Sequence, residues 1–384
     1  MKKKSLIQKE NEKKVLTAYW SGNKKLSEIP ANCLSHINYA FAYIDKEGRV
    51  HPDSSYREAE EDFKQLNEYK KKYPHLKTSI SIGGWGRNST YFSDIALTEE
   101  SREEFAQATI DQYIKKYEFD GIDLDWEFPV KGGVDDLRYR PEDKKNFNFL
   151  VREFRKQLDQ LGKERERSYL LTAATPAGRY QNTATSGGPY DPADSYDFQE
   201  LAKYLDLIYI MTYDLGNGYN PVVNFNAGMR PLSKDPTPSA QKRWNNLEGS
   251  VDYYLNQGVP RNKLVVGTPF YGRSFYVKST DQHGLFQKFH SPGPTPDWLA
   301  IKNNYLNDPN WEKHWEEKAE VPWLFHSEKQ LFLSYDNPYS IRKKAEFIVK
   351  ENLRGGMIWH LSMDDAENSL LHALAGPILE NKEK

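Results

Sequence analysis

The stretch Asp120-Gly-Ile-Asp-Leu-Asp-Trp-Glu-Phe-Pro129 alternates acidic and apolar side chains. Side chains along a β-strand point alternately to its two faces, so this pattern predicts a strand with one acidic and one apolar face. The acidic face holds Asp123, Asp125 and Glu127, and the apolar face holds Ile122, Leu124, Trp126 and Phe128. We expect the apolar face to pack against helices. The three carboxylates then point toward the interior of a sheet that closes on itself.

Seven further apolar runs, rich in Val, Ile, Leu and Tyr, have the length of a buried strand. With the acidic strand the eight runs are Val15–Trp20, Ser35–Tyr43, Thr78–Ile82, Gly121–Phe128, Leu170–Thr175, Leu205–Tyr213, Leu264–Phe270 and Gly355–Leu361. Segments such as Ser101–Tyr117 and Asp143–Leu161 separate them and carry apolar residues at helical spacing. Alternating strands and helices favour a parallel sheet. Eight such units predict an α/β fold, a (β/α)8 TIM barrel, with its active site at the C-terminal ends of the strands.

One long stretch interrupts the seventh and eighth units. Residues 275–334 include Trp298, Trp311, Trp315 and Trp323, and they are too numerous for an ordinary connection. We therefore predict a catalytic barrel built from residues 12–274 and 335–380, with residues 275–334 as an inserted subdomain. Residues 1–11 and 381–384 are predicted to be charged termini.

The overall composition argues against several classes of partner. The 384 residues include 53 Lys and Arg and 55 Asp and Glu, which gives a net charge of −2. The protein therefore has no net positive charge that would attract nucleic acid or an anionic membrane. The single cysteine, Cys33, cannot form an intramolecular disulfide, and no Cys/His zinc motif is present. No apolar stretch follows the basic start, so we expect no export signal or membrane span and leave the location open. We expect a monomer without a cofactor or a metal.

Three inward-facing carboxylates are costly, because burial and like charge both oppose their ionisation. A solvated acidic face requires an edge strand, which the apolar residues of the opposite face argue against. Two functional interpretations remain: oxygen ligands for a divalent metal, or a general acid tuned by its neighbours. No His accompanies the carboxylates, and Trp85, Trp126 and Trp359 fall near strand ends. Aromatic rings suit sugars better than metals, although the 14% aromatic content also fits ordinary packing.

The acidic strand closely resembles the DxxDxDxE signature of glycoside hydrolase family 18, the chitinases. The match is complete at Asp120, Asp123, Asp125 and Glu127. Three more segments resemble family motifs in the expected order: Ser81-Ile-Gly-Gly-Trp85, Met211-Thr-Tyr-Asp214 and Gly355-Gly-Met-Ile-Trp359. The inserted stretch resembles the α+β insertion that deepens the substrate cleft in one branch of the family. The resemblance thus spans nearly the whole chain.

The resemblance implies roles for the residues nearest the reacting bond. Glu127 protonates the glycosidic oxygen, Asp125 orients the acetamido group of the substrate, and Asp123 buffers Asp125 from within the barrel. Tyr213 and Asp214 hold the N-acetyl group.

It also implies a set of substrate-binding residues. Tyr19 and Ser81 form hydrogen bonds nearby, Gly84 belongs to the third-strand motif, and Met211 lines the N-acetyl pocket. Trp359 forms the floor of the cleaved sugar's subsite, Trp85 stacks under a sugar on the leaving side, and Arg273 contacts sugar. Tyr219 stands where family members often have a Trp for a second leaving-side sugar. Simple packing or ion pairing remains an alternative for Ser81, Met211 and Arg273.

The function expected from the resemblance is hydrolysis of β-1,4 bonds between N-acetylglucosamine units of chitin or its oligomers. Three alternatives stay open: an endo-β-N-acetylglucosaminidase, a chitin-binding lectin-like protein without turnover, and a metal enzyme that loses activity on chelation. The presence of Glu127 argues against the lectin.

The spacing of the carboxylates bears on the mechanism. Asp125 and Glu127 are two residues apart on one strand, so their Cα atoms lie about 6.5–7 Å apart on one face. Two groups so placed do not easily flank a sugar, as schemes with an enzymic nucleophile or base require. Substrate-assisted retaining catalysis, in which the acetamido oxygen is the nucleophile, remains.

Overall fold

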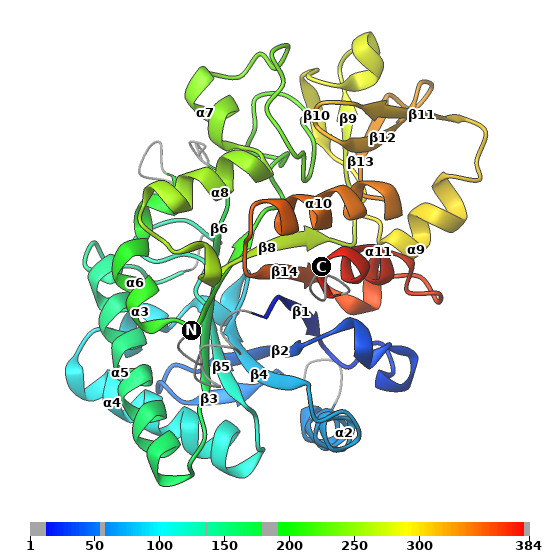
Figure 1. The fold of residues 1–384 in the computed structure, drawn as a ribbon. Coiled ribbons are helices and arrows are strands. Elements are labelled where there is room, and N and C mark those ends of the chain that lie inside the picture. The colour runs from blue at the N-terminus through cyan, green and yellow to red at the C-terminus, as the bar shows by residue number, and fades with distance from the viewer. Residues whose placement is uncertain (1–12, 54–57, 135–136, 179–190, 380–384) are drawn as a thin grey trace, which may run out of the picture.

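Eight parallel strands close into a barrel in the computed structural model, which describes residues 13–53, 58–134, 137–178 and 191–379. The strands are β1 (Val15–Trp20), β2 (His36–Ile44), β4 (Lys77–Gly83), β5 (Gly121–Asp125), β6 (Leu170–Pro176), β7 (Leu207–Met211), β8 (Leu264–Pro269) and β14 (Gly355–Trp359). β1 pairs with both β14 and β2, which closes the ring (Figure 1). The structure confirms the predicted (β/α)8 TIM barrel. β3 (Val50–Pro52) extends β2 as an antiparallel ninth strand.

Helices surround the barrel, as the amphipathic segments predict (Figure 1). Those between or after barrel strands are α2 (Ala59–Lys72), α3 (Phe92–Ile95), α4 (Glu99–Thr109), α5 (Asp143–Glu164), α6 (Phe198–Tyr204), α7 (Ser239–Trp244), α8 (Leu247–Asn256), α10 (Pro338–Lys350) and α11 (Ser369–Leu379). Sequence signals set several of their ends. α10 begins with an Asn337–Ser340 capping box and Pro338 in its first turn. The predicted helix over 101–117 instead changes to π-helical hydrogen bonding at Ile110–Lys116.

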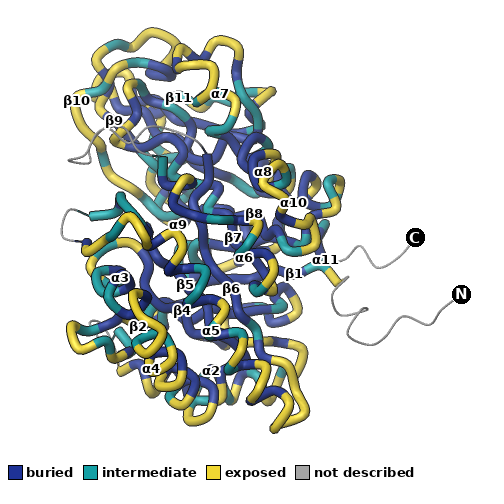
Figure 2. Tube along the Cα trace, turned by 90° about the vertical axis from the view of Figure 1, so that its left-hand side faces the viewer, coloured by how far each residue is buried: buried dark blue, intermediate teal, exposed yellow. Residues whose placement is uncertain are grey.

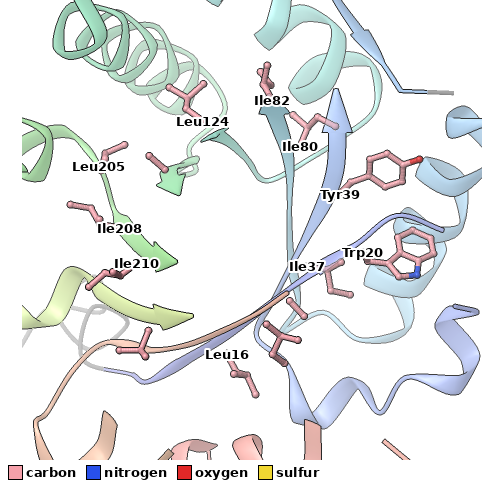
Figure 3. Packing of buried hydrophobic residues seen from close by; sticks show 14 of the residues in the cluster. Leu16, Trp20, Ile37, Tyr39, Ile80, Ile82, Leu124, Leu205, Ile208 and Ile210 are labelled. Carbon is pink, nitrogen blue, oxygen red and sulfur yellow. The ribbon is translucent and has the colours of Figure 1, made fainter. Parts of the chain in front are cut away.

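Alternation along the strands separates two cores. Outward-facing side chains such as Leu16, Ile37, Ile80 and Leu124 pack against the helices (Figure 3). Inward-facing side chains, including Tyr19, Tyr209, Val265 and Met357, fill the barrel itself. The buried residues follow the strands through the centre of the molecule, while exposed residues lie mainly on the outer helices and loops (Figure 2).

A second sheet stands between β8 and β14. Its antiparallel strands are β9 (Arg273–Val277), β10 (Phe289–Pro292), β11 (Trp311–Glu316), β12 (Val321–His326) and β13 (Leu331–Ser334), in the order β10-β9-β13-β12-β11. A short helix, α9 (Trp298–Ala300), lies between β10 and β11. One face of the sheet joins the main core through Leu324 and Leu333. The other face packs on the loop that carries Val223, Phe225 and Leu232.

The chain enters and leaves this sheet on two neighbouring strands, β9 and β13. Arg273 at the start of β9 and Ser334 at the end of β13 are paired in register. The sheet forms a lobe beside the barrel (Figures 1 and 2). Within the described ranges, no helix combines the length and apolar character needed to cross a membrane.

Candidate active site

Asp123 lies deepest of the three inward carboxylates and is fully buried. Its Oδ2 accepts hydrogen bonds from the Tyr19 hydroxyl (2.7 Å) and the Ser81 hydroxyl (2.6 Å), and its Oδ1 accepts one from Thr172 (2.6 Å). Burial raises the pKa of Asp123, while these hydrogen bonds oppose the rise. Strands β1, β4 and β6 therefore hold one carboxylate of β5 in a single orientation.

Asp125 is the next inward residue, at the end of β5, and its side chain is 3% exposed. Its Oδ1 is buried and has no hydrogen-bond partner among the described residues. Burial raises the pKa of Asp125 well above its usual value, and the negative charges of Glu127 and Asp123 raise it further. A buried polar oxygen without a hydrogen-bond partner is uncommon, and this oxygen is available to accept a hydrogen bond from a ligand.

Glu127 lies just beyond the end of β5 and is 8% exposed. Burial raises its pKa to about 8, with a further contribution from the negative charge of Asp214. A pKa raised this far favours the protonated form of the carboxyl group at neutral pH. Its backbone N–H donates to the Ser89 hydroxyl over 3.2 Å, and Ser89 is itself fully buried.

Two glycines of the third-strand motif let the backbone approach this strand. Gly83 and Gly84 have φ values of +102° and +87°. The Gly84 N–H donates to the Asp125 carbonyl over 2.7 Å. A Cβ at Gly84 would lie 2.5 Å from the Phe41 ring, and one at Gly83 would lie 2.3 Å from the Asp125 carbonyl oxygen. The glycines thus position the main chain beside Asp125.

Tyr213 and Asp214 follow β7 and approach the carboxylates from another side. Burial raises the pKa of Tyr213 well above its usual value, and the charges of Asp125 and Glu127 add to the rise. Asp214 Oδ1 accepts hydrogen bonds from the Tyr271 hydroxyl and from Arg273 Nε, both at 2.7 Å. Arg273 Nη2 pairs with Asp214 Oδ2 at 2.6 Å. Arg273 is thus engaged with Asp214.

Aromatic rings gather at the mouth of the barrel. Trp359 stacks on Phe41 at a centroid distance of 5.5 Å and lies 5.3 Å from Tyr19. Trp359 and Met211 are both partly buried against the inner core. Trp126, in contrast, is 1% exposed and stacks on Phe92 in the outer core. It is therefore not part of this inner aromatic group.

Two predicted sugar contacts are exposed. The Trp85 side chain is 53% exposed and meets Phe128 edge-on at 6.3 Å. Tyr219 is 40% exposed, and its backbone N–H donates to the Asn217 side chain. Among the described residues, no hydrogen bond or ring contact joins Tyr219 to the carboxylates.

Asp120, the first residue of the DxxDxDxE signature, lies away from the other three. Its Oδ2 contacts Lys70 Nζ (3.0 Å) and the Thr78 N–H (2.9 Å), and its Oδ1 contacts Arg167 Nη2 (2.5 Å). Its partners belong to the opposite end of the strand. This residue therefore stabilises the fold, and it does not contribute to the group of inward carboxylates.

Sequence reasoning missed three residues that shape this site. Thr172 binds Asp123, Tyr271 binds Asp214, and Ser89 accepts from the Glu127 N–H while also lying within hydrogen-bond distance of the Gly84 and Asp125 carbonyls. Thr172 and Tyr271 could have been found from their positions on or after predicted strands. Ser89 carries no such signal, because it lies in a short 3-10 turn after the third strand's motif.

Comparisons with known proteins agree with this geometry. The model of the glycosyl hydrolases family 18 matches residues 15–364. The chain is 37% identical to Chitinase A1 of Niallia circulans over 311 residues, which cover 78% of this chain and 42% of that protein. It is similar to the structure of a family 18 N-acetylglucosaminidase from Paenibacillus barengoltzii, with a TM-score of 0.82, 30% identity, and 95% and 99% of the two chains covered. It is also similar to the Ostrinia furnacalis Group IV chitinase in complex with allosamidin, with a TM-score of 0.79, 28% identity, and 96% and 97% coverage.

The matched region contains every strand of the barrel and all four motifs that carry the resemblance. Two of the signature carboxylates, Asp125 and Glu127, stand at the C-terminal end of β5, where enzymes of this architecture place their chemistry. The chain therefore belongs to the glycosyl hydrolases family 18 and carries that family's hydrolase domain on a (β/α)8 barrel.

Proposed function

We propose that this protein hydrolyses β-1,4 bonds between N-acetylglucosamine units in chitin or its oligomers, with Glu127 as the catalytic acid. One observation carries the proposal: a carboxyl group with a pKa of about 8 lies two residues after Asp125, whose buried Oδ1 has no hydrogen-bond partner among the described residues. The first group can donate a proton at neutral pH, and the second can accept a hydrogen bond from a substrate N–H. The similarity to proteins named chitinases supports this substrate class.

We propose a substrate-assisted, retaining mechanism. Glu127 donates its proton to the glycosidic oxygen as the bond to the anomeric carbon breaks. The acetamido oxygen of the same sugar forms a bond to that carbon, which yields a cyclic oxazolinium ion with the leaving sugar departing as an alcohol. Water then attacks the anomeric carbon, the ring opens, and the water proton passes to the Glu127 carboxylate.

Neighbouring residues support this scheme. Asp125 accepts a hydrogen bond from the acetamido N–H and stabilises the positive charge of the cyclic ion. Asp123 accepts hydrogen bonds from three hydroxyl groups, and its negative charge raises the pKa of Asp125. Tyr213 positions the acetamido oxygen for attack.

The remaining residues of the site would bind the sugar chain. Asp214 and Met211 would contact the N-acetyl group, and Trp359 would form the floor under the cleaved sugar. Trp85 would stack on the leaving side, followed more weakly by Tyr219. The partial burial of Trp359 and the exposure of Trp85 and Tyr219 fit an inner and two outer positions along a bound chain.

A second candidate is release of single sugars by an N-acetylglucosaminidase. The similarity to the Paenibacillus barengoltzii structure, which covers 99% of that chain, favours it. The chemistry at the carboxylates would be the same. The candidates differ in where an oligomer is cut, so a product profile on defined N-acetylglucosamine oligomers separates them.

The mechanism is tested on the same oligomers. We expect an NMR spectrum of the first product to show the retained anomer, and a thiazoline mimic of the cyclic ion to inhibit. Fully deacetylated chitosan should not be cut, because it lacks the nucleophile. An inverted first product, or efficient cleavage of that chitosan, would exclude the mechanism. The metal alternative predicts loss of turnover in EDTA and its return with Mg²⁺ or Mn²⁺, whereas we expect turnover to survive.

A further inference from the structure

Three metal-ligating side chains converge on the second sheet, outside the active site. They are His283, in the turn Asp281–Gly284, and Glu312 and His314, on β11. One nitrogen of each imidazole and one Glu312 carboxylate oxygen all lie within 4.8 Å of one another. We propose that these three residues bind a divalent transition ion of the zinc class.

Strand β11 supplies two of the three ligands. Glu312 and His314 are two residues apart on β11, so both project from the same face. Their cross-strand partners on β12 are Phe325 and Trp323, which line that face. Among the strands that the structure describes, β11 lies at the edge of its sheet, and none of the others covers its outer side.

The turn before β10 supplies the third ligand. His283 has a φ of +52°, and its N–H donates to the Thr280 carbonyl over 3.1 Å. The indole N–H of Trp323 donates to the His283 carbonyl over 3.4 Å. These contacts hold the backbone of the turn so that His283 Nδ1 reaches Glu312 Oε2 at 2.7 Å.

Aromatic neighbours restrict the orientation of both imidazoles. The His314 ring stacks on Trp323 at 4.8 Å with an interplanar angle of 23°, and the His283 ring lies 4.0 Å from the His314 ring. Phe325 meets His283 edge-on at 6.3 Å. Ligands restrained by surrounding groups lose little freedom when a metal binds, which favours affinity.

The donor atoms select the class of ion. His314 Nε2 lies 3.2 Å from the same Glu312 oxygen, and the described ion pairs of Glu312 are with these two imidazoles. Zinc bonds of about 2.0–2.1 Å in a tetrahedron place ligand atoms roughly 3.4 Å apart, so small side-chain adjustments suffice. Imidazole suits Zn²⁺, Ni²⁺ and Cu²⁺, whereas Mg²⁺ and Ca²⁺ prefer oxygen ligands. The His283 and Glu312 side chains are 53% and 40% exposed, which leaves room for water as a further ligand.

The ion would join the turn at Asp281–Gly284 to the edge of the sheet, far in sequence from the catalytic carboxylates. It would stabilise the folded protein by mass action without taking part in sugar cleavage. Sequence reasoning alone misses this site, because 28 residues separate His283 from Glu312 and no short motif contains all three ligands.

The test uses the full chain with any affinity tag removed and pre-treated with EDTA, which is then removed by dialysis. We expect calorimetric titration with ZnCl₂ to show one ion bound per chain, and Zn²⁺ but not Mg²⁺ to raise Tm. His314→Gln and Glu312→Gln should each weaken zinc binding by about tenfold or more, since even outer-shell changes cost that much at metal sites. Gln keeps the size of each side chain and removes the ligand chemistry.

The matched control is His290→Gln, an exposed histidine on β10 of the same sheet. It should bind zinc like the unmodified chain. Near-ultraviolet circular dichroism and turnover, both expected to be unchanged, verify folding of each variant. Absence of zinc binding to the unmodified chain would overturn the proposal. So would equal binding by the triple variant His283→Gln, Glu312→Gln, His314→Gln.

Discussion

The Arg273 guanidinium forms a bidentate ion pair with the Asp214 carboxylate, with Nε 2.7 Å from Oδ1 and Nη2 2.6 Å from Oδ2. Paired hydrogen bonds of this kind fix both the position and the plane of a carboxylate. The charge of Asp214 is one of the causes that raise the pKa of Glu127, after burial. Arg273, a residue of the second sheet, thereby positions a group that raises the pKa of Glu127, the proposed catalytic acid.

This relationship predicts a shift in pH dependence for Asp214→Asn. With Glu127 as the proposed acid, the rate depends on its protonated form, so kcat/KM of the unmodified enzyme should fall as pH rises past about 8. Removing the negative charge, with Arg273 left nearby, lowers the pKa of Glu127. We expect the alkaline limb of the kcat/KM profile to move to lower pH. A limb at unchanged or higher pH would contradict the assignment of Asp214.

Glu127→Gln should remove most turnover and leave oligomer binding intact, because it deletes only the transferable proton. General acid catalysis is typically worth about 10²–10⁴-fold in rate. Assays use an unactivated oligomer, since a good leaving group needs little protonation. Near-normal turnover would show that another group is the acid.

The same variant has an expected effect on stability. Between the ordinary pKa of 4.5 and the folded value of about 8, folded Glu127 binds more protons than unfolded Glu127. The free energy of unfolding of the unmodified protein therefore falls as pH rises through this window. Gln carries no charge, so Glu127→Gln should flatten that part of the curve in urea titrations at pH 5, 7 and 9. An equally steep decline in the variant would place the titrating group elsewhere.

Ser89→Ala is expected to lower both stability and rate. The Ser89 hydroxyl accepts from the buried Glu127 N–H, and the alanine leaves that donor without its partner. An unsatisfied buried group costs about 1–3 kcal/mol in the free energy of unfolding. We also expect a lower kcat, because the backbone of Glu127, the proposed acid, loses a hydrogen-bond partner. Ser89→Cys keeps a weak hydrogen-bond acceptor, so its stability and kcat should lie between those of Ser89→Ala and those of the unmodified protein. Unchanged kcat in both variants would limit Ser89 to a structural role.

Trp85→Ala and Trp359→Ala should behave differently. Trp85 is 53% exposed, so its loss should raise KM for long oligomers while Tm stays nearly constant. Trp359 packs on Phe41 and Tyr19, so its loss should weaken oligomer binding, reduce kcat and lower Tm together. Steady-state kinetics on oligomers of increasing length, with thermal denaturation, separate these outcomes. Unchanged kinetics for Trp359→Ala would mean that it only packs.

The barrel was predictable because its strands carry strong periodic signals. Ile122 and Leu124 pack outward and Asp123 and Asp125 lie inward, as strict alternation requires. The change to π-helical bonding at Ile110 has no comparable signal, because the apolar spacing there fits either kind of helix. A three-residue strand such as β3 is equally hard to foresee, since too few residues alternate.

The site was predictable only in part, for a different reason. Motifs reveal residues whose chemistry is unusual in their position, such as three carboxylates on one buried strand. They do not reveal the partners that orient those residues, because Thr172, Ser89 and Tyr271 belong to no motif and meet their targets only after the barrel closes. Thr172 and Tyr271 are marked only by their positions on or just after a strand. Arg273 illustrates the limit: the sequence left both a sugar contact and an ion pair open for it, and only the fold shows that its ion-pair partner is Asp214.

The register pairing of Arg273 with Ser334 has an evolutionary consequence. A segment whose ends stand one strand spacing apart, about 5 Å, can be spliced into a loop without stretching the elements on either side. The barrel could thus acquire or lose this lobe in a single genetic event. One face of the second sheet, however, rests on Val223, Phe225 and Leu232 of a different loop, and its other face joins the main core through Leu324 and Leu333. Any such exchange must therefore be accompanied by mutation of that loop, and the two segments are expected to vary together among descendants.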